Sequence, residues 1–186
     1  MEMGRMRNAT LHMPLSYMLD LPGRELMYKL HLEPEHAVYH YKFTKYREPD
    51  SDKWCREVPA MSTCGMMMSR AIYDKLGGWP EELGIYGGGE NFINFTMAVL
   101  GMRKYVFGGG PLYHYAAKRG YNWSYDDFHR NRTIATLMYG DMDLAKKYIL
   151  NIKGNPDQKL KIWQSVKNNE SILEHKKKIE AQQVIT

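Results

Sequence analysis

The chain has 186 residues, 44% of them hydrophobic and 25% charged, and no apolar run approaches the ~18 residues that span a bilayer. Its net charge of +5 suits anionic ligands such as nucleotide diphosphates but is too small to indicate nucleic acid as a partner. The two cysteines, Cys55 and Cys64, give no disulfide framework, and the first residues lack the apolar stretch of a secretory signal. We therefore predict a globular protein with reduced thiols and a cytoplasmic location.

The part of the chain before residue 59 contains two predicted strands between irregular segments. Residues 26–32 form an extended apolar piece, and residues 37–46 alternate in hydrophobicity and are rich in aromatics, as half-buried strands are. Residues 1–23 predict irregular structure with one short apolar piece, and residues 48–58 predict a polar loop.

The centre of the chain predicts a strand, two helices and a glycine-rich loop. Residues 59–68 combine small and apolar side chains and predict a buried strand, after which Ser69 can cap a helix over residues 70–76. The glycine-rich loop at 84–89 leads into a second helix, which Gly101 ends. The apolar positions of this helix follow a period near 3.6, at Phe92, Phe95, Thr96, Val99 and Leu100.

Glu90 stands where the glycine-rich loop enters the second helix, a position that suits ligand chemistry. Glycines permit close approach of a ligand to the backbone, and a helix N-terminus offers unpaired N–H groups. A carboxylate there can accept a proton or hydrogen-bond a sugar hydroxyl. Beyond a short strand at 105–107 and three glycines, His114 could meet a divalent metal or a phosphate. The alternative is that the glycines only form a turn, Glu90 only caps the helix, and His114 is a surface residue.

These features occur in a recognisable order. Residues 64–79 read Cys-Gly-Met-Met-Met-Ser-Arg-Ala-Ile-Tyr-Asp-Lys-Leu-Gly-Gly-Trp, and Gly-Gly-Glu-Asn at 88–91 and His114 follow. The series, over residues 59–120, resembles the C-terminal half of a GT-A glycosyltransferase. It is similar to family two, to the polypeptide N-acetylgalactosaminyltransferases and to the β-1,4-galactosyltransferases. The resemblance implies an α/β fold of the nucleotide-diphospho-sugar transferase type, with a mixed sheet followed by C-terminal helices.

The resemblance also implies roles for individual residues. Gly65 would let the donor sugar lie against the backbone, and Trp79 and Tyr86 would border the acceptor site. Glu90 would contact donor or acceptor, and it would act as general base in inverting members. His114 would be the third protein ligand of a Mn²⁺ or Mg²⁺ on the nucleotide diphosphate.

The loop residues Gly88 and Gly89 and the helix residue Asn91 would complete the donor and acceptor contacts. Asn91 agrees with the Glu-Asn form of the N-acetylgalactosaminyltransferases, many of which retain configuration, and departs from the Glu-Asp form common in family two. Both stereochemical outcomes therefore stay open. The sequence Asp-Ser-Asp at 50–52 has the form of the metal-binding triplet of these enzymes, but no buried strand precedes it, so we interpret it as an exposed turn.

The segment after His114 resembles the lid that covers the donor in GT-A enzymes. Tyr121 and Trp123 would stack on a base or a sugar ring. A solvated loop leading into a helix is the alternative. Basic side chains would meet the diphosphate oxygens, which arginine can bind bidentately: Lys118, Arg119, Arg130 and Arg132.

Residues 125–150 predict helices broken at Gly140-Asp141, and residues 157–182 predict further helix. The lysines at 176–178 predict a solvated face and leave open a peripheral contact with a membrane or a polyanion. The expected buried positions are Ile134, Leu137, Met138, Leu144, Tyr148, Ile149, Leu160, Ile162, Trp163, Val166, Ile172, Leu173 and Ile179.

No β-α-β alternation precedes residue 59, so the nucleotide-binding half of a GT-A domain is missing from the pattern. We therefore divide the chain into a partial catalytic domain over 1–120 and a lid segment with a helical extension over 121–186. We expect a metal-dependent glycosyltransferase. It would move a sugar from a nucleotide-sugar, specifically a UDP-sugar, to a hydroxyl group of a carbohydrate or a protein. If the chain is truncated, we expect it to be inactive by itself. The alternatives are a non-catalytic carbohydrate-binding remnant and, with less support, a metal-dependent hydrolase that uses His114.

Overall fold

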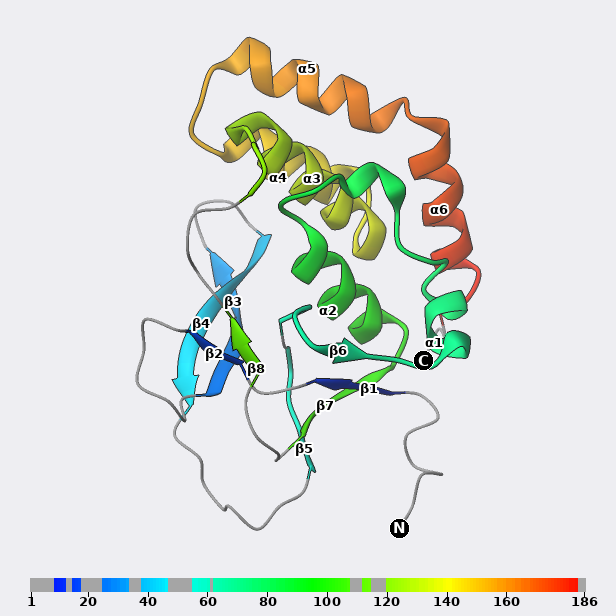
Figure 1. The fold of residues 1–186 in the computed structure, drawn as a ribbon. Coiled ribbons are helices and arrows are strands. Elements are labelled where there is room, and N and C mark those ends of the chain that lie inside the picture. The colour runs from blue at the N-terminus through cyan, green and yellow to red at the C-terminus, as the bar shows by residue number, and fades with distance from the viewer. Residues whose placement is uncertain are drawn as a thin grey trace.

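The computed structural model describes residues 9–12, 15–17, 25–33, 38–46, 55–60, 62–107, 112–114 and 120–183. These residues form an α/β protein, as predicted, in which helices predominate (Figure 1). Within them, no helix combines the length and the apolar character that crossing a bilayer requires.

The described strands pair in three groups. A four-stranded mixed sheet has the order β5-β7-β1-β6, with β1 parallel to β7 and the other two pairings antiparallel. Two further pairs are β2 with β8, which are parallel, and β3 with β4, which are antiparallel. The bounds are β1 Ala9–His12, β2 Leu15–Tyr17, β3 Glu25–Glu33, β4 Val38–Tyr46, β5 Cys55–Glu57, β6 Met66–Met67, β7 Arg103–Phe107 and β8 Leu112–His114.

The strand predictions are correct where the sequence pattern is strong and wrong where pairing is decided by distant residues. The expected strands at 26–32, 37–46 and 105–107 appear as β3, β4 and β7. The strand expected over 59–68 is wrong in extent, because only Met66–Met67 pairs, with β1. The polar loop expected at 48–58 contains β5, and the irregular N-terminal segment contains β1, both of which pair with β7.

The helices begin and end at side chains and glycines that the sequence indicated. Ser69 accepts a hydrogen bond from the Ile72 backbone and caps the first helix, as predicted. Gly101 has φ +65° and ends the second helix in a Schellman arrangement, in which Met102 N–H donates to the Met97 carbonyl over 2.8 Å. The bounds are α1 Arg70–Lys75, the 3₁₀ turn η2 Glu81–Leu83, α2 Gly89–Val99, α3 Tyr125–Tyr139, α4 Met142–Asn151, α5 Pro156–Lys167 and α6 Glu170–Glu180.

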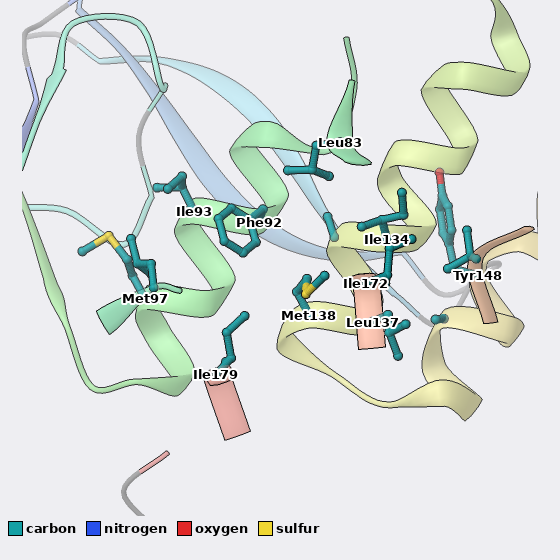
Figure 2. Packing of buried hydrophobic residues seen from close by; sticks show 14 of the residues in the cluster. Leu83, Phe92, Ile93, Met97, Ile134, Leu137, Met138, Tyr148, Ile172 and Ile179 are labelled. Atoms are coloured by element: carbon teal, nitrogen blue, oxygen red, sulfur yellow. The ribbon is translucent and has the colours of Figure 1, made fainter. Parts of the chain in front are cut away.

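One hydrophobic core joins α2 to the C-terminal helices. Figure 2 shows Phe92 of α2 facing Met138 of α3, with Ile179 of α6 nearby. Met97 lies on the other side of α2, where its sulfur accepts a hydrogen bond from the Thr10 hydroxyl of β1. Full burial of side chains of this size stabilises the fold by roughly 1.5–3 kcal/mol each. The division of the chain at residue 120 stays a prediction.

Most of the predicted buried positions in the C-terminal helices are confirmed, with corrections at two sites. Leu160 on α5 is 49% exposed, because the core side of that helix is taken by Ile162, Trp163 and Val166. Lys176 is buried rather than solvated, since its ammonium group donates to the Gly140 carbonyl at the end of α3 over 2.6 Å.

Candidate functional site

The glycine-rich loop between η2 and α2 lies directly against α3. Gly87 and Gly88 have φ of +89° and +82°, which favours glycine. A Cβ atom at Gly88 would come within 3.0 Å of the Asn131 carbonyl oxygen, and one at Gly87 would be 2.9 Å from the Phe128 carbonyl oxygen. The Asn131 side chain also donates to the Tyr86 carbonyl over 2.6 Å. The sequence suggested that these glycines let a ligand approach the loop backbone closely. At Gly87 and Gly88, it is the backbone of α3 that approaches closely.

Gly89 and Trp79 meet on another side of the loop. A Cβ atom at Gly89 would be 3.1 Å from the Trp79 ring, so the absence of a side chain lets the indole cover the first turn of α2. The indole also packs edge-on against Phe92, with 5.7 Å between ring centroids, and is 37% exposed. Trp79 therefore has one edge fixed by the core and a surface open to solvent beside the loop.

Glu90 lies in the first turn of α2, where the helix dipole favours a negative charge. Its carboxylate is half-buried and accepts a hydrogen bond from the Thr63 hydroxyl, with 2.9 Å between Oγ1 and Oε1. Its backbone carbonyl accepts a hydrogen bond of 2.9 Å from the Asn94 side chain, one turn further along. Thr63 was not predicted as a site residue, because no spacing in the sequence connects it with Glu90.

The turn that carries Thr63 precedes β6 and contains Gly65. Gly65 has φ +67°, and the Cys64 N–H donates to the Ser62 hydroxyl over 3.1 Å. Cys64 is a free cysteine. The turn and the start of α2 thus bring Gly65, predicted to border the donor, to the same region as Glu90.

An aromatic cluster lies beside the glycine-rich loop and is formed by Tyr86, Tyr121, Trp123 and Phe128. The Tyr86 ring centroid is 4.7 Å from that of Trp123, 5.5 Å from Phe128 and 6.4 Å from Tyr121. Trp123 is 45% exposed, and Tyr121 is exposed as well. The structure therefore brings together Tyr86 and Trp123, which the sequence placed 37 positions apart in the same predicted site.

The arginines predicted to meet a diphosphate have partners within the protein. Arg130 donates to the Glu82 carbonyl of η2 over 2.8 Å. The Arg132 guanidinium lies 4.9 Å from the centroid of the Phe128 ring, a member of the aromatic cluster. Lys118 and Arg119 fall outside the described residues.

Asn91 and His114 complete the set of residues predicted around Glu90. Asn91 follows Glu90 on α2, and its side chain is buried. His114 is the last residue of β8, where its backbone pairs in register with Tyr17 of β2, and its side chain is outside the described part of the chain. In the ranges that the structure describes, no three His, Cys, Asp or Glu side chains are grouped as metal ligands.

A buried lysine lies close to the same helix. Lys104 on β7 is 4% exposed, and its ammonium group donates to the Asn94 carbonyl over 3.2 Å. Burial lowers the pKa of Lys104 to about 8, against a smaller raising effect from Glu57. The lysine thereby ties β7 to the turn of α2 that follows Glu90.

Neither known protein-family models nor curated proteins include a match to this chain. A functional proposal therefore depends on the residues gathered around the start of α2.

Proposed function

We propose that the chain is the acceptor-side part of a GT-A glycosyltransferase. It would take part in the transfer of a sugar to a hydroxyl group of a carbohydrate or a protein. The donor would be a nucleotide-sugar of the UDP type. The observation that carries this proposal is the placement of Glu90 at the N-terminus of α2, hydrogen-bonded by Thr63, with Trp79 at the adjoining turn and the aromatic cluster beside the same loop.

The proposed chemistry follows from these residue types. A carboxylate can hydrogen-bond a sugar hydroxyl and accept its proton when the two lie within hydrogen-bond reach. Exposed indole and phenol rings offer apolar faces with a polar edge, which suit the C–H faces and hydroxyl groups of a pyranose ring. Glu90 would orient the acceptor or act as base, and Trp79, Tyr86 and Trp123 would hold sugar rings.

A divalent metal remains part of the proposal through His114 alone. Mn²⁺ or Mg²⁺ would supply a Lewis acid that neutralises charge on the leaving diphosphate. The described residues do not assemble a set of three ligands, so we assign no step of the reaction to the metal. The cytoplasmic location is likewise retained as a prediction.

Release of UDP from UDP-hexoses in the presence of an oligosaccharide acceptor, which receives the sugar, tests the catalytic role of Glu90. We expect Glu90→Gln to lower the rate of release by at least about 100-fold, the usual contribution of a general acid or base. Glu81→Gln is the matched control, because Glu81 is an exposed carboxylate on the neighbouring η2 turn. Undiminished release by the Glu90→Gln protein would exclude the proposed role.

A second candidate is carbohydrate binding without turnover, which the exposed rings of Tyr121 and Trp123 in the aromatic cluster favour. Here Trp123→Ala should weaken binding of an oligosaccharide at least about 5-fold, since loss of a ring contact in a binding site costs more than about 1 kcal/mol at such positions. Leu160→Ala, an exposed apolar position on α5, is the control. Binding that needs neither nucleotide nor metal, together with an absence of UDP release, would support this candidate over the transferase.

A further inference from the structure

Hydrogen bonds within the turn at residues 62–65 stabilise its conformation, and this turn contacts α2 through Thr63. Ser62 is buried, and its hydroxyl accepts the Cys64 N–H, while the Met66 N–H donates to the Thr63 carbonyl over 3.4 Å. Gly65 supplies the positive φ that the turn requires. Strand β6 then pairs with β1 of the four-stranded sheet. Thr63 is therefore attached to the sheet through short backbone and hydroxyl contacts.

The hydroxyl of Thr63 engages one specific oxygen of Glu90. An ionised carboxylate can only accept, so the hydroxyl donates to Oε1 over the 2.9 Å distance. Among the residues that the structure describes, Thr63 provides the one side-chain hydrogen bond to this carboxylate. Oε2 of Glu90 has no side-chain hydrogen bond from the residues that the structure describes. The contact at Oε1 restricts rotation of the carboxylate about its terminal torsion.

We propose that Thr63 is a positioning residue that aims Oε2 of Glu90 at the acceptor hydroxyl. The inference deepens the proposed function and depends on it. Thr63 itself touches no reacting atom. Loss of the Thr63 hydroxyl would leave the substrate contacts in place and allow the Glu90 carboxylate to turn away from the acceptor. Misplacement of a reacting group by about 1 Å can lower the rate about 100-fold. The effect should therefore fall on kcat rather than on KM.

The test compares Thr63→Val, which keeps the shape and removes the hydroxyl, with Thr63→Ser, which keeps the hydroxyl. UDP release from the UDP-hexose that the wild-type chain uses best, measured at a fixed, high concentration of an oligosaccharide acceptor, gives kcat and KM. The ¹³C resonance of the Glu90 carboxyl, assigned by its loss in Glu90→Gln, reports the contact without any turnover. We expect Thr63→Val to lower kcat about 10- to 100-fold with KM within about 2-fold and to move the carboxyl resonance. Thr63→Ser should restore both towards the wild type.

Two results would overturn the inference while leaving the proposed function intact: Thr63→Val with wild-type kcat, or a carboxyl resonance unmoved by Thr63→Val. An equal loss of kcat in Thr63→Val and Thr63→Ser would also overturn it, because it would point to packing rather than to the hydroxyl. A folded wild-type chain that releases no UDP from any UDP-hexose would contradict catalysis by this chain and leave the carbohydrate-binding alternative, and the positioning role would fall with it.

Discussion

Replacement of Gly88 by alanine tests how the glycine-rich loop is built. Two costs add at this position. The φ of +82° costs alanine about 1–2 kcal/mol. The new methyl group would also overlap the carbonyl of Asn131, which is backbone in the middle of α3 and cannot rotate away, and such overpacking costs about 1–3 kcal/mol. Gly88→Ala should therefore lower the free energy of unfolding by about 2–5 kcal/mol.

Gly101→Ala is the matched control, because Gly101 has a similar φ of +65° and open space where a Cβ would lie. It should incur the backbone cost alone, about 1–2 kcal/mol. Urea unfolding followed by circular dichroism gives both free energies. Equal losses in the two proteins, within about 0.5 kcal/mol, would refute the close packing of the loop on α3. If Gly88→Ala does not fold while Gly101→Ala does, the packing argument is upheld.

Two further predictions concern buried basic groups of α6. Lys176→Met removes an ammonium group that donates to the Gly140 carbonyl at the end of α3. Hydrogen bonds to charged groups contribute about 1.5–3 kcal/mol, so urea unfolding should show a loss of that order. Lys178→Met, which breaks only an exposed pair on the same helix, should lose no more than about 1 kcal/mol, and equal losses would contradict the burial of Lys176. His175 donates to the Leu76 carbonyl over 3.0 Å, and burial lowers its pKa below the ordinary value of 6.5, with Glu82 and Lys178 as the nearby charges. The folded state then binds fewer protons than the unfolded state, so the free energy of unfolding should decline as the pH falls below about 6.5, and less so in His175→Gln. An identical pH dependence in both proteins would count against a buried neutral imidazole.

The sequence predicted those parts of the fold that depend on local signals. The period of apolar residues defined α2, and the capping residues Ser69 and Gly101 set helix ends correctly. Break signals at Gly140 and Asp141 separated α3 from α4. Each of these signals acts through bonds that span only a few residues, so they can be recognised without knowledge of the whole fold.

The sequence did not predict features that depend on residues far apart in the chain. Strand β1 pairs Ala9 with Arg103, and neither short segment has a pattern that specifies its partner. The burial of Lys176 depends on carbonyl groups at the end of α3, whose position the lysine-rich sequence of α6 does not indicate. The lysine run was correctly interpreted as exposed at Lys177 and Lys178.

The candidate site likewise combines residues that the sequence predicted with a contact that it did not predict. Trp79, Tyr86, Glu90 and Trp123 were selected from the sequence, and the structure gives Glu90 a half-buried position at a helix N-terminus beside exposed aromatic rings. The contact of Glu90 with Thr63 could not be inferred, because it joins a turn and a helix that meet only in the folded protein.

The most direct measurement is a calorimetric titration of the purified chain with UDP, with and without Mn²⁺. A nucleotide-sugar transferase that uses His114 should bind UDP in a metal-dependent manner, and His114→Ala should abolish the binding. Leu112→Ala, an exposed position on the same strand β8, should leave it unchanged. Absence of UDP binding by the folded chain would contradict a donor site within this chain and would leave an acceptor-side part that cannot transfer a sugar by itself. Binding that ignores both Mn²⁺ and His114 would contradict the assignment of a metal-dependent glycosyltransferase.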